Sequence, residues 1–182
     1  KVFVSNGGVA SIVRFDFGAS ILNNPAVGTF NVVGASGLRG IAITRECDRW
    51  FGLVTSYNNN KVFWLDFVNG LSQPPTTGEI TFFTSYSFPA SVVIADDGGD
   101  YYAFIQSALG VQYRLSFGSS IVDKNGTGQN LGNFGISNEN FALDMTKVNS
   151  DWYGFSIDLA NRRLVRQTYP LSCDADIPTS AE

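Results

Sequence analysis

The 182-residue chain contains no histidine, and this limits the chemistry that it can perform. Ser-His-Asp and Cys-His nucleophile activation, histidine general bases and histidine-ligated zinc are all excluded. Chemistry by carboxylates or tyrosine remains, and it needs acidic side chains that converge in one pocket. Asp16 and Asp66 occupy the same place in two copies of a repeat, which favours a structural role over a catalytic one. We therefore predict no catalytic residues.

The strongest candidate for a ligand site is an acidic turn. Asp96, Asp97 and Asp100 surround two glycines, and three carboxylates in such a loop could bind a hard cation such as Ca²⁺. The equivalent turns of the neighbouring repeats, residues 46–49 and 148–151, do not share this set of ligands. Two interpretations follow, a plain hairpin turn or a weak calcium site, and no other cofactor is expected.

Two further segments match known motifs only in part. Residues 15–18 contain the Asp-Phe-Gly triplet that holds magnesium in kinases, but no glycine-rich loop or catalytic-loop aspartate accompanies it. Residues 34–40 are rich in glycine like a phosphate-binding loop, but such a loop leads into a helix, and here a strand is expected to follow. We interpret the first segment as a strand end and the second as a turn.

Aromatic residues supply the candidates for surface contacts. Trp50, Tyr101 and Trp152 recur at a fixed place in the repeat, which favours packing in the core over stacking on sugars. Tyr57 and Tyr86 lie outside that pattern and are predicted to be exposed. Together with the polar turn after Tyr57, they give the predicted binding residues, which are Tyr57, Asn58, Asn59 and Tyr86.

A period of 50 residues organises the elements that must position these side chains. Phe17, Phe67 and Phe117 close equivalent segments and lie 50 residues apart. Alternating apolar and polar residues bounded by Gly, Asn or Pro turns indicate strands. Short strands that repeat every 40 to 50 residues or so are typical of β-propeller blades. The sequence therefore predicts an all-β fold, a β-propeller segment built from four-stranded blades.

The alternation assigns fourteen strands, or about three and a half four-stranded blades. The blades are predicted at residues 1–34 (partial), 40–84, 91–135 and 141–170 (partial). Their outer strands are predicted at residues 29–33, 79–84 and 130–135, and none is assigned to the last copy. Residues 171–182 lose the pattern and are predicted to form an exit linker toward a following domain.

An incomplete ring would leave two apolar blade faces in contact with water. Large exposed apolar patches are uncommon on monomers, and propellers close with about 4 to 8 blades. We therefore expect the remaining blades in the same parent polypeptide or in a second chain. Closure of the two incomplete ends into a compact four-bladed ring stays open as an alternative.

Composition and charge exclude several classes of partner. Hydrophobic residues make up 44% of the chain and charged residues 15%, which is typical of a folded globular protein. The formal net charge of −4 argues against nucleic acid as a partner, and no apolar run is long enough to span a bilayer. Cys47 and Cys173 could form a disulfide in an oxidising compartment or remain two separate thiols.

Three stretches carry a resemblance to a known family, and they are residues 12–21 (IVRFDFGASI), 130–135 (NLGNFG) and 151–155 (DWYGF). They resemble the propeller-like repeats of very large secreted surface proteins of Bacteroidetes. Those repeats read roughly Asn-Trp-Tyr-Gly-Phe, Leu-x-Arg-Leu-Asp-Phe-Gly-x-Ser-Leu and Asn-Leu-Gly-Asn-x-Gly. The resemblance extends to Pro170 and is weakest over residues 62–110, where Val68 replaces a glycine.

The resemblance implies an extracellular or cell-surface protein, similar to gliding-motility adhesins exported by the type 9 secretion system. It implies no catalytic residues, and it places an immunoglobulin-like domain after Cys173. We expect a non-enzymatic interaction module that binds surface polysaccharide or a protein of the surface machinery. Two alternatives stay open, a glycan-active hydrolase or lyase that uses carboxylate or tyrosine groups, and a purely structural spacer. The loops expected to bind are residues 58–60, 73–78, 96–100 and 123–128.

Overall fold

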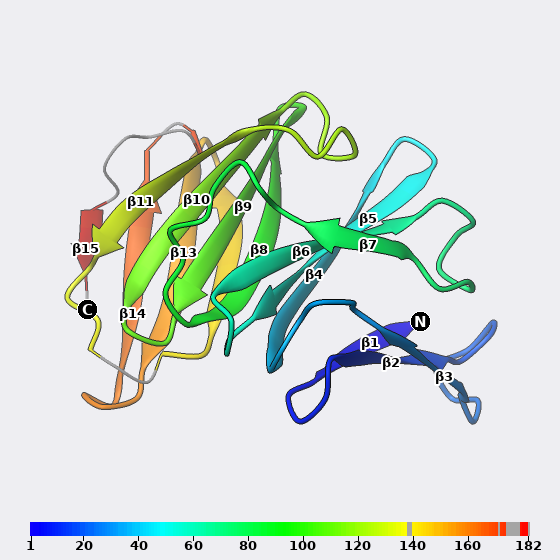
Figure 1. Ribbon diagram of the computed structural model, residues 1–182. Coiled ribbons are helices and arrows are strands. Elements are labelled where there is room, and N and C mark those ends of the chain that lie inside the picture. Colours follow the sequence, from blue (N-terminus) through cyan, green and yellow to red (C-terminus); the bar gives the residue numbers. More distant parts are fainter. Residues whose placement is uncertain (138–139, 171, 174–178, 182) are drawn as a thin grey trace.

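The computed structural model describes residues 1–137, 140–170, 172–173 and 179–181. Within these ranges the chain consists of strands and connecting turns, and fifteen strands form four antiparallel sheets. Figure 1 shows the sheets following one another from the N-terminal sheet (blue) to the C-terminal sheet (orange). The first and last sheets lie at opposite ends of this row.

The sheets are called A to D in chain order, and the strands of each sheet follow one another from one edge to the other. Sheet A contains β1 (Val2–Asn6), β2 (Ser11–Asp16) and β3 (Ala26–Asn31). Sheet B contains β4 (Leu38–Glu46), β5 (Arg49–Ser56), β6 (Lys61–Phe67) and β7 (Thr76–Glu79). Sheet C contains β8 (Pro89–Asp97), β9 (Asp100–Ser107), β10 (Val111–Gly118) and β11 (Thr127–Asn133). Sheet D contains β12 (Leu143–Val148), β13 (Asp151–Asp158), β14 (Arg163–Tyr169) and β15 (Thr179–Ala181).

The apolar core lies between the sheets, with one cluster of buried side chains at each junction. In β5, Val54 belongs to the cluster shared with sheet A, whereas Phe51 and Leu53 belong to the cluster shared with sheet C. Successive side chains of a strand point to opposite faces. The nearly continuous apolar sequence of β5 therefore fills two junctions at once.

The sheets approach one another along their first strands. β4 contacts β8, and β8 contacts β12, whereas the fourth strands make no comparable contact with another sheet. The two sheets approach closely at Gly40, where a Cβ atom would lie 2.7 Å from both the Ser91 Cα and the Val92 nitrogen. Sheets that meet at their inner strands and separate toward their outer strands have the radial order of propeller blades.

The all-β prediction is confirmed, but the outer strands begin about three residues earlier than predicted. β3, β7 and β11 start at Ala26, Thr76 and Thr127, and the last two positions lie within segments that were predicted as loops. These strands form the exposed edges of their sheets, and they are rich in Thr and Gly. An edge strand needs little apolar alternation, so its sequence resembles that of a loop.

Sheet D contains a fourth strand that the sequence did not predict. β15 pairs with β14, so residues 179–181 of the predicted linker belong to this sheet. At three residues, β15 is too short to show alternation. The rest of the predicted linker, apart from residues 172–173, lies outside the described residues. Sheet A is consequently the one sheet with three strands among those described.

Candidate functional site

Arginine and aromatic side chains gather where the chain passes from one sheet to the next. Arg39 lies at the start of β4, Phe88 directly precedes β8, and Phe141 lies shortly before β12. Because the first strands of sheets B, C and D are neighbours, these residues reach the same end of the molecule. Tyr57 joins them from the turn after β5. We call these four residues the Arg39 cluster.

The members of the Arg39 cluster contact one another through their ring faces. The Arg39 guanidinium carbon lies 5.2 Å from the centre of the Tyr57 ring and 5.9 Å from that of Phe141. The rings of Tyr57 and Phe88 are 5.2 Å apart. Cations over aromatic faces are attracted by the ring quadrupole, so these contacts hold the guanidinium in place. Phe88 and Phe141 nevertheless remain 38% and 44% exposed.

Hydrogen bonds fix the turn that presents Tyr57. The backbone N–H of Tyr57 donates to the Gly37 carbonyl at 3.0 Å, and the side-chain amide of Asn59 donates to the Gly34 carbonyl at 2.7 Å. The Asn60 side-chain oxygen accepts from the Phe88 N–H at 2.7 Å. Asn60 has a φ of +58°, a conformation that asparagine tolerates well. The turn is thus tied to the connections that lead into sheets B and C.

The predicted binding residues fall at the junction between sheets B and C, but not all of them are exposed. Tyr57 belongs to the Arg39 cluster, and Asn58 is exposed beside it. The predicted exposure of Tyr86 is wrong, because this residue is only 6% exposed. Its ring packs 5.0 Å from that of Phe83 and 5.6 Å from that of Tyr113, in the core that sheets B and C share.

Asn59 and Tyr86 line the same cavity, which has a volume of about 240 Å³. The Lys61 ammonium and the Glu79 carboxylate form an ion pair of 2.6 Å in its wall. The Tyr86 hydroxyl and the Asn59 side-chain oxygen are buried and have no hydrogen-bond partner among the described residues. Burial raises the pKa of the Tyr86 hydroxyl, so it stays protonated at neutral pH.

The acidic turn of residues 96–100 forms the hairpin between β8 and β9. Asp96 accepts a hydrogen bond from the Gly99 N–H at 2.9 Å, while the Asp97 carboxylate lies 2.6 Å from the Lys147 ammonium. Burial by itself would raise the pKa of Asp97, but hydrogen bonds from the Lys147 ammonium and the Cys173 backbone N–H lower it to about 2. No described residues form a group of three acidic or thiol side chains able to hold a metal. The structure offers no geometry for a calcium site, which stays a prediction.

Asp66 is held in the structure by two cations. Its carboxylate is 2% exposed and accepts two hydrogen bonds from the Arg49 guanidinium, at 2.8 and 2.6 Å. The Lys124 ammonium lies 2.8 Å from the same carboxylate. Burial would raise the pKa of Asp66, but the hydrogen bonds from Arg49 and Lys124 keep it below its usual value. The geometry agrees with the structural role predicted from the repeat.

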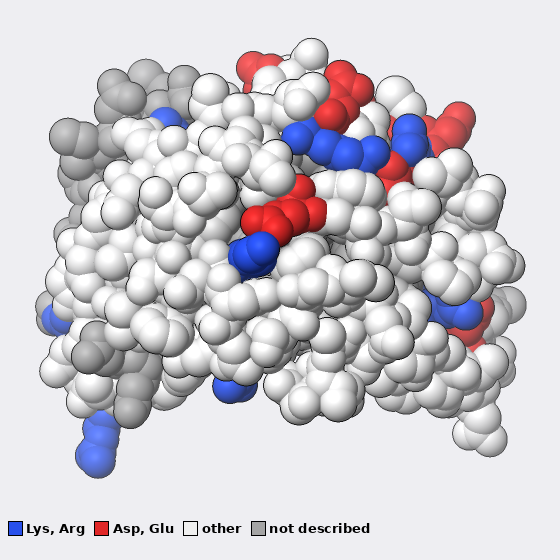
Figure 2. Space-filling view, in the orientation of Figure 1, with Lys and Arg blue, Asp and Glu red and all other residues white. Residues whose placement is uncertain are grey.

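Three further acidic side chains, Asp48, Asp97 and Asp151, lie apart from Asp66. Asp48 pairs with Arg45 in the exposed hairpin after β4, Asp97 pairs with Lys147, and Asp151 begins β13 in sheet D. On the face drawn in Figure 2, acidic and basic groups mostly lie side by side among large uncharged areas. Asp48, Asp66, Asp97 and Asp151 are thus distributed over three sheets.

The two cysteines do not form a disulfide. Cys47 is exposed in the hairpin between β4 and β5, and Cys173 is buried against sheet C. The disulfide considered from the sequence is therefore wrong for this structure, because one thiol faces solvent while the other lies in the core. The described chain also contains no helix able to cross a bilayer.

Comparison with known proteins bears on the fold. No protein-family model matches the chain, and no curated protein does so. A chain in the crystal structure of a nidogen/laminin complex is similar in fold, with a TM-score of 0.61 and 15% sequence identity. The match covers 98% of this chain. The fold is a β-propeller. At this identity the likeness concerns the fold alone, and this chain spans 59% of the length of the one that it matches.

Three members of the Arg39 cluster were not predicted from the sequence of this β-propeller. Arg39 lies at the start of β4, Phe141 holds the equivalent place just before β12, and Phe88 precedes β8. The sequence could have identified them by their position next to an inner strand, because the inner strands of a propeller meet around one axis. Contacts between different sheets cannot be obtained from periodicity within one repeat.

Proposed function

We propose that this β-propeller is a non-enzymatic interaction module that binds a protein partner through the Arg39 cluster. The observation that carries the proposal is the exposed guanidinium of Arg39, held between the rings of Tyr57 and Phe141. Arginine, tyrosine and other large aromatic residues are enriched at the energetic centres of protein interfaces. The ring contacts order these side chains before a partner binds, which lowers the entropic cost of association.

The fold supports a protein as the partner. Loops from sheets B, C and D converge at one end of the inner strands, and such loops carry binding in many folds with a rigid scaffold. The structural neighbour was solved as part of a complex between two proteins. A polysaccharide is the alternative ligand, and the experiment below distinguishes it. No observation favours the glycan-active enzyme, whose carboxylates would have to converge.

We further propose that sheets A to D are blades of a larger ring in an extracellular, adhesin-like surface protein. The repeats resemble those of secreted Bacteroidetes proteins, and the nidogen/laminin chain continues well beyond the matched length. Outward-facing side chains of both end sheets also support further blades, because Val27 in sheet A and Leu164 in sheet D are more than half exposed. Surface labelling of intact cells with an antibody against the propeller tests the location.

The binding proposal is tested with the native polypeptide and its R39E variant. Cross-linking on intact cells followed by mass spectrometry identifies the contacting protein, and its affinity is then measured with purified components. We expect R39E to weaken binding by about 30-fold or more, as for a central interface residue. L22S is the matched control, because Leu22 is 90% exposed and lies outside the cluster. Equal affinity of the two variants, or binding to a glycan array alone, would refute a protein site at the Arg39 cluster.

A further inference from the structure

Sheet A lacks the strand that begins every other sheet. Val2 in β1 pairs with Phe15 in β2, as Gly52 in β5 pairs with Leu65 in β6. β1 also contacts β4 in the way that β5 contacts β8, although β5 is the second strand of its sheet. β1 therefore corresponds to a second strand. Its inner edge has no neighbouring strand among those described.

A carboxylate joins neighbouring sheets at two junctions. Glu46, four residues before Trp50, accepts hydrogen bonds from the backbone N–H of Ile121 at 2.9 Å and from the next residue at 3.2 Å. Asp97, four residues before Tyr101, accepts one from the backbone N–H of Cys173 at 2.9 Å. In both cases the acid is the last residue of an inner strand, at the start of the hairpin, and it reaches the next sheet along the chain.

The acceptor loops of these contacts are equivalent to one another. Ile121 follows Phe117 by four residues, and Cys173 follows Tyr169 by four residues. Leu71 follows Phe67 by the same interval, so it holds this place in sheet B. The repeat thus predicts that the Leu71 N–H receives a carboxylate from the first hairpin of sheet A.

An arginine contact confirms that the Leu71 loop is placed like the Cys173 loop. Arg114 of sheet C donates to the Cys173 carbonyl at 2.8 Å, and Arg14 of sheet A donates to the Leu71 carbonyl at 3.2 Å. Arg14 and Arg114 are 100 residues apart, two periods of the repeat. The junction between sheets A and B therefore has the arginine half of the contact and lacks the acidic half.

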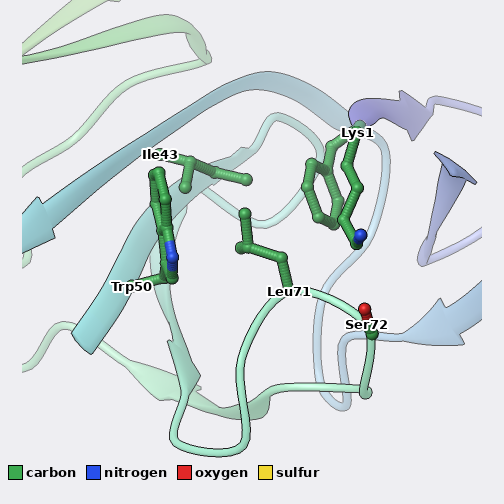
Figure 3. A pocket seen from close by; sticks show the side chains of 6 residues that line it. Lys1, Ile43, Trp50, Leu71 and Ser72 are labelled. Carbon is green, nitrogen blue, oxygen red and sulfur yellow. The ribbon is translucent and has the colours of Figure 1, made fainter. Parts of the chain in front are cut away.

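The place of the missing hairpin is open space. A cavity of about 540 Å³ lies between sheets A and B, and its wall contains no acidic side chain. Figure 3 shows Trp50 and Ile43 on one side, Lys1 on the other, and Leu71 and Ser72 from the β6–β7 loop below. The aromatic and aliphatic surfaces suit an apolar strand, whereas the Lys1 ammonium already pairs with Asp16 of sheet A at 3.0 Å.

We propose that this cavity and the free edge of β1 form a socket for one further inner strand of the same repeat. The occupant is an extended polypeptide segment that pairs with β1 and places a carboxylate on the Leu71 N–H. Strand addition at a free edge supplies affinity through backbone hydrogen bonds, and side-chain pockets supply specificity. A second copy of this chain does not provide the occupant, because β4, β8 and β12 already pair within their own sheets.

The test fuses a copy of residues 89–101 directly before Lys1. The copied segment ends with its tyrosine, which then directly precedes Lys1, just as Trp50 directly precedes Phe51 in sheet B. The copied strand and its hairpin therefore keep the register of the repeat. Fusion keeps the local concentration of the segment high. Three fused chains are compared: the unchanged copy, D97N in the copy and D96N in the copy. The two variants lose the same charge, but only D97N removes the acid four residues before the aromatic residue.

We expect the unchanged copy to protect the β1 amides from hydrogen exchange and to shift the Leu71 amide proton resonance downfield. D97N in the copy should abolish the Leu71 shift and lower the melting temperature by about 3–8 °C, while D96N leaves both near those of the unchanged copy. Unprotected β1 amides in the unchanged copy, or equal effects of D96N and D97N, overturn the proposal. The inference depends on the propeller arrangement and not on partner binding at the Arg39 cluster, so either proposal can fail alone.

Discussion

At the scale of single residues, ionisable side chains fasten the sheets. Asp66 is buried in β6. Its carboxylate pairs with Arg49, next to the hairpin after β4, and with Lys124 in the loop before β11. Asp158 is fully buried, and hydrogen bonds from Ser137, Asn161 and Arg163 hold its pKa below the usual range despite burial. Both carboxylates are thus held in place by hydrogen bonds from neighbouring segments of the chain.

We expect D66N to lower the free energy of unfolding by about 1–3 kcal/mol, because charge-assisted hydrogen bonds from Arg49 and Lys124 are lost. Denaturant unfolding at neutral pH measures this change. D48N is the control, since the Asp48 side chain is fully exposed and its pair with Arg45 adds little. Similar stability of the two variants would contradict the structural role of Asp66.

Asp97 makes stability depend on pH in the acidic range. Its pKa is lowered to about 2 in the folded chain, below the ordinary value of 3.8, so folding favours the ionised form. The resulting stabilisation is complete above about pH 4 and is lost as the pH falls toward 2. We therefore expect the stability difference between the native chain and D97N to shrink over this range in urea unfolding. A difference that is constant from pH 5 to pH 2 would rule out this linkage.

At the scale of elements, the contact between inner strands depends on a residue without a side chain. Gly40 in β4 lies against the backbone of Ser91 and Val92 in β8, where no side chain can move aside. We expect G40A to cost about 1–3 kcal/mol, since a methyl group would force the two strands apart. G8A is the control, because its Cβ would meet only a side-chain oxygen, at 3.6 Å. An unchanged free energy of unfolding in G40A would show that β4 and β8 are not in close contact.

The elements also show how far the sequence determines the fold. β6 falls within the blade predicted at residues 40–84, and its apolar sequence is buried along most of its length. β7 and β15 were misplaced or missed, since edge strands with one exposed side carry polar, short sequences. Tyr57 was recognised as a surface residue, but Arg39 and Phe141 were not, because their contact joins sheets B and D. The periodicity of the sequence thus identifies strands that are buried on two sides, but it does not predict contacts between repeats.

At the scale of the whole molecule, the end sheets differ from the middle sheets. Val2, Val4 and Val27 of sheet A are 43 to 63% exposed, and Ile157 and Leu164 of sheet D are 44% and 55% exposed. Equivalent strands of sheets B and C are buried on both faces. The exposed faces have the composition of a blade junction without a neighbour, as expected of part of a larger ring.

V27D and L164D test the proposal that further blades cover the two end sheets. In the 182-residue chain both side chains face water, so we expect each variant to change the melting temperature by less than about 2 °C. In the native polypeptide, where further blades would cover them, each charge should cost several degrees or prevent folding. The control variant L22D should leave the melting temperature unchanged in both proteins. Equal, small effects in both proteins would exclude blades on these faces.

The most direct measurement is an NMR distance between two inner strands. The radial arrangement directs an α proton of Gly40 at the Val92 nitrogen, because a Cβ in that direction would lie 2.7 Å from it. The account predicts a strong nuclear Overhauser effect between the Gly40 α protons and the Val92 amide proton. If this signal is absent while the cross-strand signals within sheets B and C are present, the sheets do not meet at their inner strands and the propeller arrangement is wrong.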